Sequence, residues 1–392
     1  MSFKPRWLPA LATLFCVVGL VAGNADGKVA AVGAAHPAVH VAAAPGSLTQ
    51  QLSRIAATAT QARMKASAKK IVLGYANLCF CDPGLNAQQQ VAQAFAKKRG
   101  WGFVAFNNNV DGPTALKNAE TMINEHVTFA VEFNFDSNVA PVIMSKFQQA
   151  HIPVIALDIA MPGAYFVGAP NEAAGIEAGL RLGLYAKQNW NCNPDLVILL
   201  NAPAVGIVSD LRVGGIREGI LKECPYLDQS KIVTQDGGGS TANSLTATRN
   251  ILTAYPNAQK ILVGGLNDVS DIGAINAAEQ LGRADSLYSW GTDGGVVLSA
   301  DAKPDPHLAG SVAFWLEGYA AYYFPQILDK IAAGHAPPVG DSPTSKNALL
   351  VDSCNVSVAQ AAKIPKLAQR VSILLKAKSG TNEAQLFCPK TK

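Results

Sequence analysis

The stretch ILVGGLNDVSDIGAINAAEQL at residues 261–281 decides the predicted fold class of this chain. Its apolar start, ILV, is too short and too continuous for a surface helix and therefore predicts a buried parallel strand. Two glycines end this run, Asn267 and Asp268 follow, and apolar residues then recur at helical spacing. The stretch predicts a strand, a polar loop and a helix, and in open α/β sheets such loops face the ligand crevice.

The same order of elements occurs earlier in the chain. Residues 128–131 predict a strand, Asn134 and Asp136 follow it, and residues 138–150 predict a helix. Strands and helices alternate from there to a long predicted helix over residues 316–332, which indicates right-handed βαβ units and parallel sheets. Because the unit recurs in both halves, we expect two similar α/β lobes that offer polar groups to a shared cleft.

Length and composition are those of a folded, two-domain protein. The chain has 392 residues, of which 49% are hydrophobic and 15% charged. This length suffices for two sizeable cores, and the composition argues against a disordered chain. The formal net charge of +4 is small, and the lysines and arginines form no dense cluster. These features argue against a nucleic-acid partner.

Residues 1–25 have the pattern of an export signal. Lys4 and Arg6 precede an apolar segment, and the sequence GNA at 23–25 offers small residues for cleavage. A membrane anchor is the alternative, but the apolar segment falls short of the about 20 residues that a spanning helix needs. We predict that the signal is removed, that the mature chain is periplasmic, and that the Ala-rich residues 26–68 form a linker.

The cysteines predict disulfides. Seven occur, and six of them follow residue 25, which is an even number in an oxidising compartment. From their positions along the chain we expect two pairs, Cys192–Cys224 and Cys354–Cys388. Cys79 and Cys81 lie too close for a relaxed bridge to each other and stay unassigned. Metal binding by these two is the alternative, but no second Cys/His pair at ligand spacing accompanies them, so we predict neither a metal nor a cofactor.

Four polar residues are candidate ligand contacts. Asp158 and Asp293 each follow an apolar strand, at matching places in the two halves. A single Asp in such a place is often a helix cap or a turn residue, but two at matching positions favour a ligand role. Arg212 precedes two glycines that allow close backbone approach, and the amide of Asn267 can donate and accept at once. Asp82 and Asn134, in loops after predicted strands, join this set.

Aromatic residues form a second candidate set, since several fall at strand ends or in loops. They are Phe80, Phe135, Trp290, Phe314 and Trp315. Any one of them is more often part of a core, but near a cleft they could stack on the apolar face of a sugar ring. The chain contains no G-x-S-x-G, P-loop or H-E-x-x-H motif. We therefore expect a binding protein and not an enzyme.

In the order and spacing of these motifs, the chain resembles the type I periplasmic binding proteins of sugar ABC importers, the ribose-binding-protein class, over about residues 69–352. The resemblance rests on IPVIALD at 152–158, Arg212 with its glycines, Asn267-Asp268, and GTD at 291–293. It implies an α/β fold of two Rossmann-like lobes with parallel sheets, joined by a hinge. It also implies that Asp158, Arg212, Asn267 and Asp293 hydrogen-bond the hydroxyls of a sugar.

The resemblance also gives the expected division of the chain. We expect an N-terminal lobe of residues 69–169 with 314–344, a C-terminal lobe of residues 170–313 with 345–353, and a C-terminal extension over 354–392.

The chain departs from the family pattern where the ligand would be recognised. The paired phenylalanines after the first strand are replaced by CFCDPG at 79–84, and the Arg that often follows the Asp158 position is Ile159. A glycine run at 237–239 replaces an expected aromatic residue, and Phe314 stands where Gln is common. These changes leave the fold expectation intact and leave the identity of the ligand open.

We therefore expect an exported, monomeric solute-binding protein that closes around a sugar or polyol and delivers it to an ABC permease. One alternative is a sensory binding protein of the same fold, for chemotaxis or signalling. Another is an exported sugar-modifying enzyme. DNA-binding repressors share this fold, but the N-terminus here carries an export signal and no helix-turn-helix.

Overall fold

The structure is a computed structural model, and it describes residues 55, 58–59, 70–80, 82–299, 305–378 and 380–390. The predicted export signal, nearly all of the predicted linker and Cys81 lie outside the described residues. Within the described part of the chain, no helix is both long enough and apolar enough to cross a membrane.

The first of two sheets has six strands in the order β11-β5-β4-β3-β1-β2. The strands are β1 (Val72–Asn77), β2 (Gly102–Asn107), β3 (Phe129–Glu132), β4 (Val154–Leu157), β5 (Tyr165–Gly168) and β11 (Leu349–Leu350). All pairings in this sheet are parallel. The connecting helices are α2 (Pro83–Lys98), α3 (Gly112–Asn124) and α4 (Ala140–Gln149). Asp82 and Asp111 cap α2 and α3 through their side chains, and a proline in the first turn favours each start.

The second sheet also has six strands, in the order β12-β10-β9-β8-β6-β7. They are β6 (Leu196–Asn201), β7 (Ile232–Asp236), β8 (Ile261–Gly265), β9 (Leu287–Asp293), β10 (Leu308–Ala313) and β12 (Cys354–Ser357). Only β12 runs antiparallel among these described strands. Its helices are α5 (Asn171–Trp190), α6 (Ile207–Glu223), α7 (Thr241–Ala254) and α8 (Asp268–Gln280). Residues 261–281 are therefore β8, a loop and α8, as predicted.

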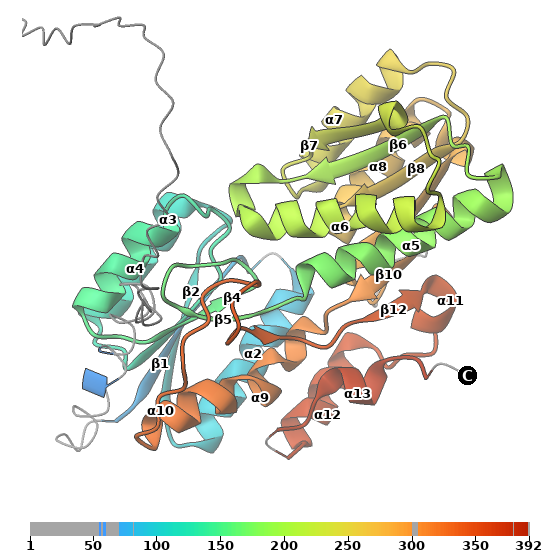
Figure 1. Ribbon diagram of the computed structural model, residues 1–392. Coiled ribbons are helices and arrows are strands. Elements are labelled where there is room, and N and C mark those ends of the chain that lie inside the picture. The colour runs from blue at the N-terminus through green and yellow to red at the C-terminus, as the bar shows by residue number, and fades with distance from the viewer. Residues whose placement is uncertain are drawn as a thin grey trace, which may run out of the picture. The chain divides into compact units, whose positions relative to one another are not determined.

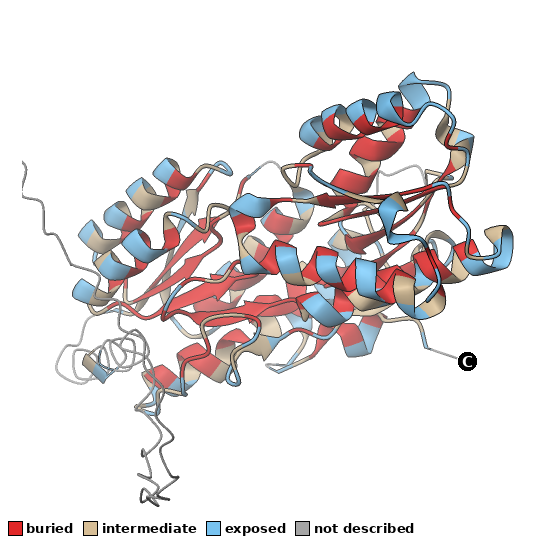
Figure 2. Cartoon of the chain, turned by 45° about the horizontal axis from the view of Figure 1, so that its top comes forward, coloured by how far each residue is buried: buried red, intermediate tan, exposed pale blue. Residues whose placement is uncertain are grey.

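Both sheets lie between layers of helices, and their central strands are buried (Figure 2), whereas β2 and β7 are partly exposed. Every residue of β3, β4, β5 and β8 is buried, which is why these strands read as continuous apolar runs in the sequence. The helices show buried residues toward the sheets and exposed residues on the opposite side (Figure 2). This pattern is what a doubly covered parallel sheet requires.

Close packing of α5 on α6 depends on glycines in both helices. A Cβ atom on Gly175 of α5 would lie 2.0 Å from the carbonyl oxygen of Arg212, and one on Gly219 of α6 would lie 2.2 Å from that of Ile176. Side chains at these positions would push the helices apart, because such distances are far below van der Waals contact. The glycines thus bring the backbone of α6 next to the start of α5.

Three short crossing segments join the two sheets. They are residues 169–170, between β5 and α5, residues 314–315, after β10, and residues 351–353, between β11 and β12. After the second of them, the chain forms η4 (Leu316–Gly318), α9 (Tyr319–Tyr322), η5 (Pro325–Asp329) and α10 (Lys330–Ala332). Figure 1 shows these helices beside α2, on the side of the first sheet.

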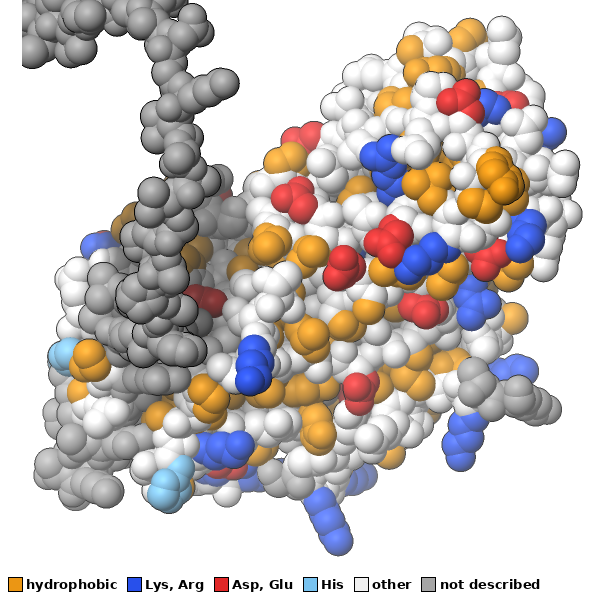
Figure 3. All heavy atoms as spheres, in the orientation of Figure 1, with side chains coloured by type: hydrophobic (Ala, Val, Ile, Leu, Met, Phe, Trp, Pro, Cys, Tyr) orange, Lys and Arg blue, Asp and Glu red, His pale blue; other side chains and the backbone are white. Residues whose placement is uncertain are grey.

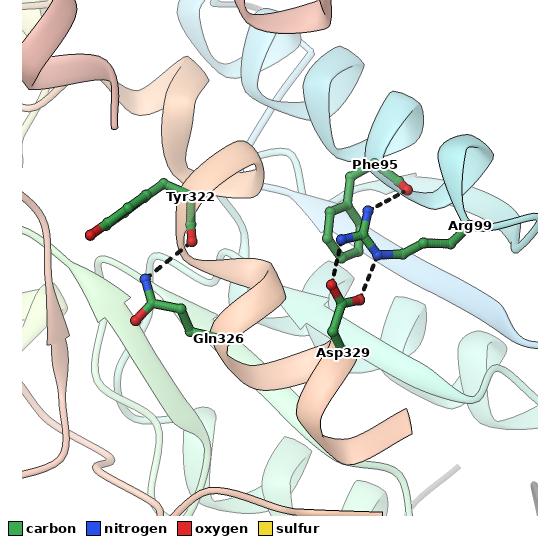
Figure 4. A network of polar contacts seen from close by, with 5 residues as sticks. All are labelled: Phe95, Arg99, Tyr322, Gln326 and Asp329. Carbon is green, nitrogen blue, oxygen red and sulfur yellow. Dashed lines mark hydrogen bonds and ion pairs between the residues drawn. The ribbon is translucent and has the colours of Figure 1, made fainter. Parts of the chain in front are cut away.

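Residues 316–332, predicted as one helix, change helix type along their length. A 3-10 turn and a short α-helix precede a π-helical turn that begins at Pro325. Proline lacks the N–H group that a regular helix needs at this point. Arg99 at the end of α2 binds the carboxylate of Asp329 with Nε and Nη2 and holds this helix against α2 (Figure 4).

Two strands near the C-terminus differ from the expected division of the chain. Residues 345–353, predicted as part of the C-terminal lobe, contain β11, which pairs with β5 of the first sheet. Residues 354–392, predicted as a separate extension, begin with β12, which pairs with β10 of the second sheet. Both are short edge strands, and two to four residues give a weak sequence pattern. The other predicted boundaries stay predictions.

The remaining C-terminal segment, residues 358–390, forms α11 (Val358–Ala361), α12 (Leu367–Lys376) and α13 (Glu383–Phe387). The predicted disulfides are both present, with Sγ–Sγ distances of 2.05 Å for Cys192–Cys224 and 2.14 Å for Cys354–Cys388. Cys79 is disulfide-bonded as well. No group of three or more His, Cys, Asp or Glu among the described residues could hold a metal ion.

Candidate ligand-binding site

Arg212 of α6 is the cation of the candidate site. Its side chain is 6% exposed, and its Nε and Nη2 donate to Asn171 Oδ1 at 2.9 and 2.6 Å. Its Nη1 donates to the carbonyl oxygen of Leu266 at 2.6 Å. The guanidinium carbon lies 4.8 Å from the centroid of the Phe314 ring. The contact between α5 and α6 therefore places Arg212 between Asn171 at the start of α5, the end of β8 and a crossing segment.

Asp158 follows β4 and approaches the site from the first lobe. Its Oδ1 accepts hydrogen bonds from the Ala169 N–H at 3.0 Å and the Tyr319 hydroxyl at 3.1 Å. Its Oδ2 is buried and accepts none from a described residue. Burial raises the pKa of Asp158 to about 6, and the charge of Arg212 opposes that rise. The backbone φ of +56° at Asp158 is rare for a residue with a side chain, and such strain clusters at functional sites.

Asp293 ends β9 and approaches the site from the second lobe. Its Oδ1 accepts a hydrogen bond from the Gly295 N–H at 2.6 Å, and its backbone φ is +88°. Burial raises the pKa of Asp293 well above its ordinary range, and the charges of Asp268 and Asp82 raise it further, while Arg212 lowers it. Asp82 belongs to the first lobe, so charges from both lobes meet at Asp293.

Asn267, Asn134 and Asp82 each make local hydrogen bonds that leave less of the side chain for a ligand. Asn267 Oδ1 accepts from the N–H and Oγ of Ser270 at 3.1 and 2.6 Å, and its Nδ2 donates to the carbonyl of Gly239 at 3.1 Å. Asn134 exchanges two hydrogen bonds with the backbone of Asp136. Asp82 caps α2 through one oxygen, which accepts from Leu85 N–H at 2.9 Å.

The aromatic candidates are divided between several places. Phe314 is buried behind Arg212, and Phe80 is 47% exposed. Phe135 of the first lobe lies against the second lobe, because a Cβ on Gly239 would be 3.4 Å from its ring. Trp290 of β9 donates from Nε1 to Oδ1 of Asn355, a residue of β12, at 3.1 Å.

Trp315 is oriented toward the C-terminal segment and not toward Asp158 and Arg212. Its ring centroid lies 5.8 Å from that of Phe387, and the guanidinium carbon of Arg370 lies 5.6 Å from it. Its φ of +56° reverses the chain after Phe314, which sends the two consecutive aromatic side chains to different clusters. Trp315 therefore packs with the C-terminal segment and apart from Phe314, which lies over Arg212.

Three buried polar residues of this region are not among the predicted ligand contacts: Asn171, Asp268 and Tyr319. Asp268 is completely buried, with Oδ1 accepting from Ser311 Oγ at 2.6 Å and Oδ2 from two backbone N–H groups at 3.1 and 3.2 Å. Burial raises its pKa to about 7. The position of Asn171 directly after Pro170 at a sheet crossing was a usable signal. Tyr319 lies in an apolar, aromatic stretch that gives no sign of a polar contact.

The rims of the two lobes touch next to the site. The Ser137 N–H, in the loop after β3, donates at 2.9 Å to the carbonyl of Ala204, which lies in the 3-10 helix η1 (Pro203–Val205) after β6. A Cβ on Gly206 would lie 3.0 Å from Ser137 Oγ. Together with the contact of Phe135, these distances show the lobes closed on each other at this edge.

Two α/β lobes joined by three crossing segments, with charged side chains from both lobes at one site, define a bilobal binding-protein fold. The chain belongs to the periplasmic binding protein domain family, whose sequence profile matches residues 74–307. This result confirms the predicted fold class and family.

Several solved structures share the fold. A galactofuranose binding protein has 19% sequence identity and a TM-score of 0.61, with 78% of this chain and 99% of that chain covered. An ABC transporter solute binding protein from Mycobacterium smegmatis with bound glycerol has 19% identity and a TM-score of 0.62, covering 76% and 97%. A Caulobacter myo-inositol binding protein bound to myo-inositol has 16% identity and a TM-score of 0.60, covering 77% and 98%. At these identities the likeness establishes the fold. Among curated proteins no relative of the chain is found.

Proposed function

We propose that this protein is an exported solute-binding protein that captures a sugar or polyol between its lobes and delivers it to an ABC permease. The observation that carries the proposal is Asp158 Oδ2, a buried carboxylate oxygen that accepts no hydrogen bond from a described residue. An unpaired buried acceptor costs about 1–3 kcal/mol, and this one belongs to a carboxylate of the first lobe on which the charge of Arg212 in the second lobe acts. A hydroxyl of a bound ligand would pair with it.

The groups around Asp158 suit a hydroxyl better than other ligand groups. Arginine has five N–H donors, and three hydrogen bonds from Arg212 go to protein acceptors. A sugar hydroxyl can donate to Asp158 and accept from Arg212 at once. Because these residues belong to different lobes, a ligand that binds both would favour closure. Three solved structures of this fold carry names or ligands of this kind, namely galactofuranose, glycerol and myo-inositol.

Export to the periplasm is supported by three features. They are the predicted signal in residues 1–25, the Cys192–Cys224 and Cys354–Cys388 disulfides, which form in oxidising compartments, and membership of the periplasmic binding protein domain family. On the face shown in Figure 3, Lys and Arg side chains are interspersed with Asp and Glu, a distribution that does not favour a nucleic-acid partner. The monomeric state stays a prediction.

The experiment that tests this function is a thermal-shift screen of the mature protein against sugars and polyols, followed by calorimetry on each hit. A transport ligand should be recovered chemically unchanged, and deletion of the gene should abolish its uptake by the cell. Consumption of the ligand would show an enzyme, whereas unaffected uptake would leave the sensory alternative. A complete lack of hits across the panel would contradict sugar or polyol binding.

A further inference from the structure

The polar groups of the candidate site carry more negative than positive charge. Asp82, Asp158 and Asp293 contribute carboxylates, and the charge of the buried Asp268 raises the pKa of Asp293. The cation among these groups is Arg212, whose charge acts on both Asp158 and Asp293. One guanidinium is too few for several carboxylates: burial and the charges of Asp268 and Asp82 hold the pKa of Asp293 well above its ordinary range. A bound cation would favour the ionised form of this group.

Hydrogen bonding shows the same surplus of acceptors. Asp82 and Asp293 each use one carboxylate oxygen, for the N–H groups of Leu85 and Gly295. No described residue donates to the second oxygen of either group, nor to Asp158 Oδ2. On the donor side, Arg212 already serves two protein acceptors. The site thus presents unused carboxylate oxygens from both lobes and few unused N–H groups.

We propose that the cleft selects a polyhydroxyl ligand that carries a protonated amine, such as an amino sugar, over its neutral parent and over the matching sugar acid. This inference rests on the proposed function and names the ligand class of the same site. An ammonium group has three N–H donors and no acceptor, which complements unused carboxylate oxygens. Closing the lobes over unbalanced carboxylates is costly, and a ligand cation would offset that cost. A ligand carboxylate would increase it.

The test uses matched sets of sugars and calorimetry on the mature protein at neutral pH. One set is glucose, glucosamine and glucuronate, and a second is galactose, galactosamine and galacturonate. We expect the amine of a set to bind at least about ten-fold more tightly than its neutral parent, a difference of about 1.4 kcal/mol. We expect no detectable binding of the acid.

A pair of charge-removing variants tests whether the site carboxylates cause the preference. Asp82→Asn removes one negative charge and keeps the cap of α2, because Asn and Asp are comparable caps. Asp111→Asn makes the same change at the cap of α3, where the carboxylate accepts from Thr114. We expect Asp82→Asn to reduce the amine preference by about three- to ten-fold and Asp111→Asn to leave it unchanged.

The outcomes separate this inference from the proposed function. Neutral sugars that bind as tightly as the amines, or more tightly, would overturn the inference and leave sugar binding in place. An equal loss of preference in both variants would also overturn it, since a general charge effect would then be the cause. If no member of either set binds, the inference fails, and the wider sugar and polyol screen decides the proposed function separately.

Discussion

Arg212 and Arg217 lie on the same helix in different surroundings. Arg212 is buried with three hydrogen bonds to Asn171 and Leu266, whereas Arg217 is exposed and donates to Gln229. We predict that Arg212→Ala weakens ligand binding by about 2–4 kcal/mol, or about 30- to 1,000-fold, because ligand and protein acceptors lose their donor. Calorimetry with a ligand from the screen measures this.

Arg217→Ala is the matched control for that prediction, and its affinity should equal that of the wild type. Circular dichroism should show both variants folded. An Arg212→Ala protein that is folded and binds normally would show that Arg212 has a structural role alone.

Glu132 predicts a pH dependence of stability that is separate from ligand binding. It is completely buried on β3, and only one of its oxygens accepts a hydrogen bond from a described residue, from Asn108 Nδ2 at 3.2 Å. Burial raises its pKa from 4.5 to about 8. The folded state therefore binds this proton more tightly than the unfolded state, and stability falls as the pH rises from about 4.5 to about 8, by at most about 1.4 kcal/mol per pH unit.

Glu132→Gln, which resembles the protonated form, should lose less stability over that pH range. Urea unfolding of both proteins at pH 5 and pH 8 measures the difference. Parallel losses in wild type and variant would mean that Glu132 is ionised in the folded state at both pH values.

Sequence reasoning identified the polar residues whose location in the fold follows from their position next to a strand or helix end. Asp158, Arg212 and Asp293 follow strands or start helices at the carboxyl edges of parallel sheets, and the structure brings their charges together. Their ligand role stays a proposal. Tyr319 could not be predicted, because it reaches Asp158 from 161 residues away, through the fold of a crossing segment.

The contact between α5 and α6 positions Arg212, and it can be tested at the scale of the helix. A Cβ on Gly175 would lie 2.0 Å from the carbonyl oxygen of Arg212. We predict that Gly175→Ala destabilises the protein by about 1–3 kcal/mol, as overpacking does, and also weakens ligand binding because α6 must move away from α5. Chemical unfolding and calorimetry measure the two effects.

Gly214→Ala, in α6, should stabilise the protein, whereas Gly175→Ala should destabilise it. Nothing lies within 4 Å of the Cβ that this substitution adds. Alanine is the better helix former, so we expect a gain of about 0.5–1 kcal/mol in the free energy of unfolding. If both variants lost the same stability, the loss would come from the helices themselves and not from their contact.

Elements with long, strong patterns were predictable, and short or context-dependent ones were not. The strand and helix in residues 261–281 follow from an apolar run and a helical repeat. β11 and β12 are two and four residues long, and their pairing depends on where the crossing segments bring the chain. The π-helical turn at Pro325 depends on packing against α2 through Arg99 and Asp329, which local propensity does not contain.

In the whole molecule, the C-terminal segment contacts both lobes and the crossing segments about which the lobes would rotate on closing. Arg370 of α12 forms a buried ion pair with Glu317 of η4 at 2.5 Å, and Asn382 donates to Asp352 of the third crossing segment at 2.5 Å. α12 also packs on α2 of the first lobe, while α11 packs on β10 and β12 of the second. The segment thus contacts both lobes and lies against the second and third crossing segments. Trp315 lies buried in the second.

Trp315 therefore offers a reporter of closure that is independent of direct ligand contact. It lies in the second crossing segment, packed on Phe387, whereas Trp101 is partly buried against the core of the first lobe, with its ring centroid 5.4 Å from that of Phe129. If ligand binding rotates the lobes about the crossings, tryptophan emission and the melting temperature should change together. A ligand at about 1,000 times its dissociation constant adds about 4 kcal/mol of stability, which a thermal scan detects. Trp315→Phe should remove most of the ligand-induced emission change, and the control Trp101→Phe should keep it. An emission change that survives in Trp315→Phe would mean that the motion does not occur at the second crossing segment.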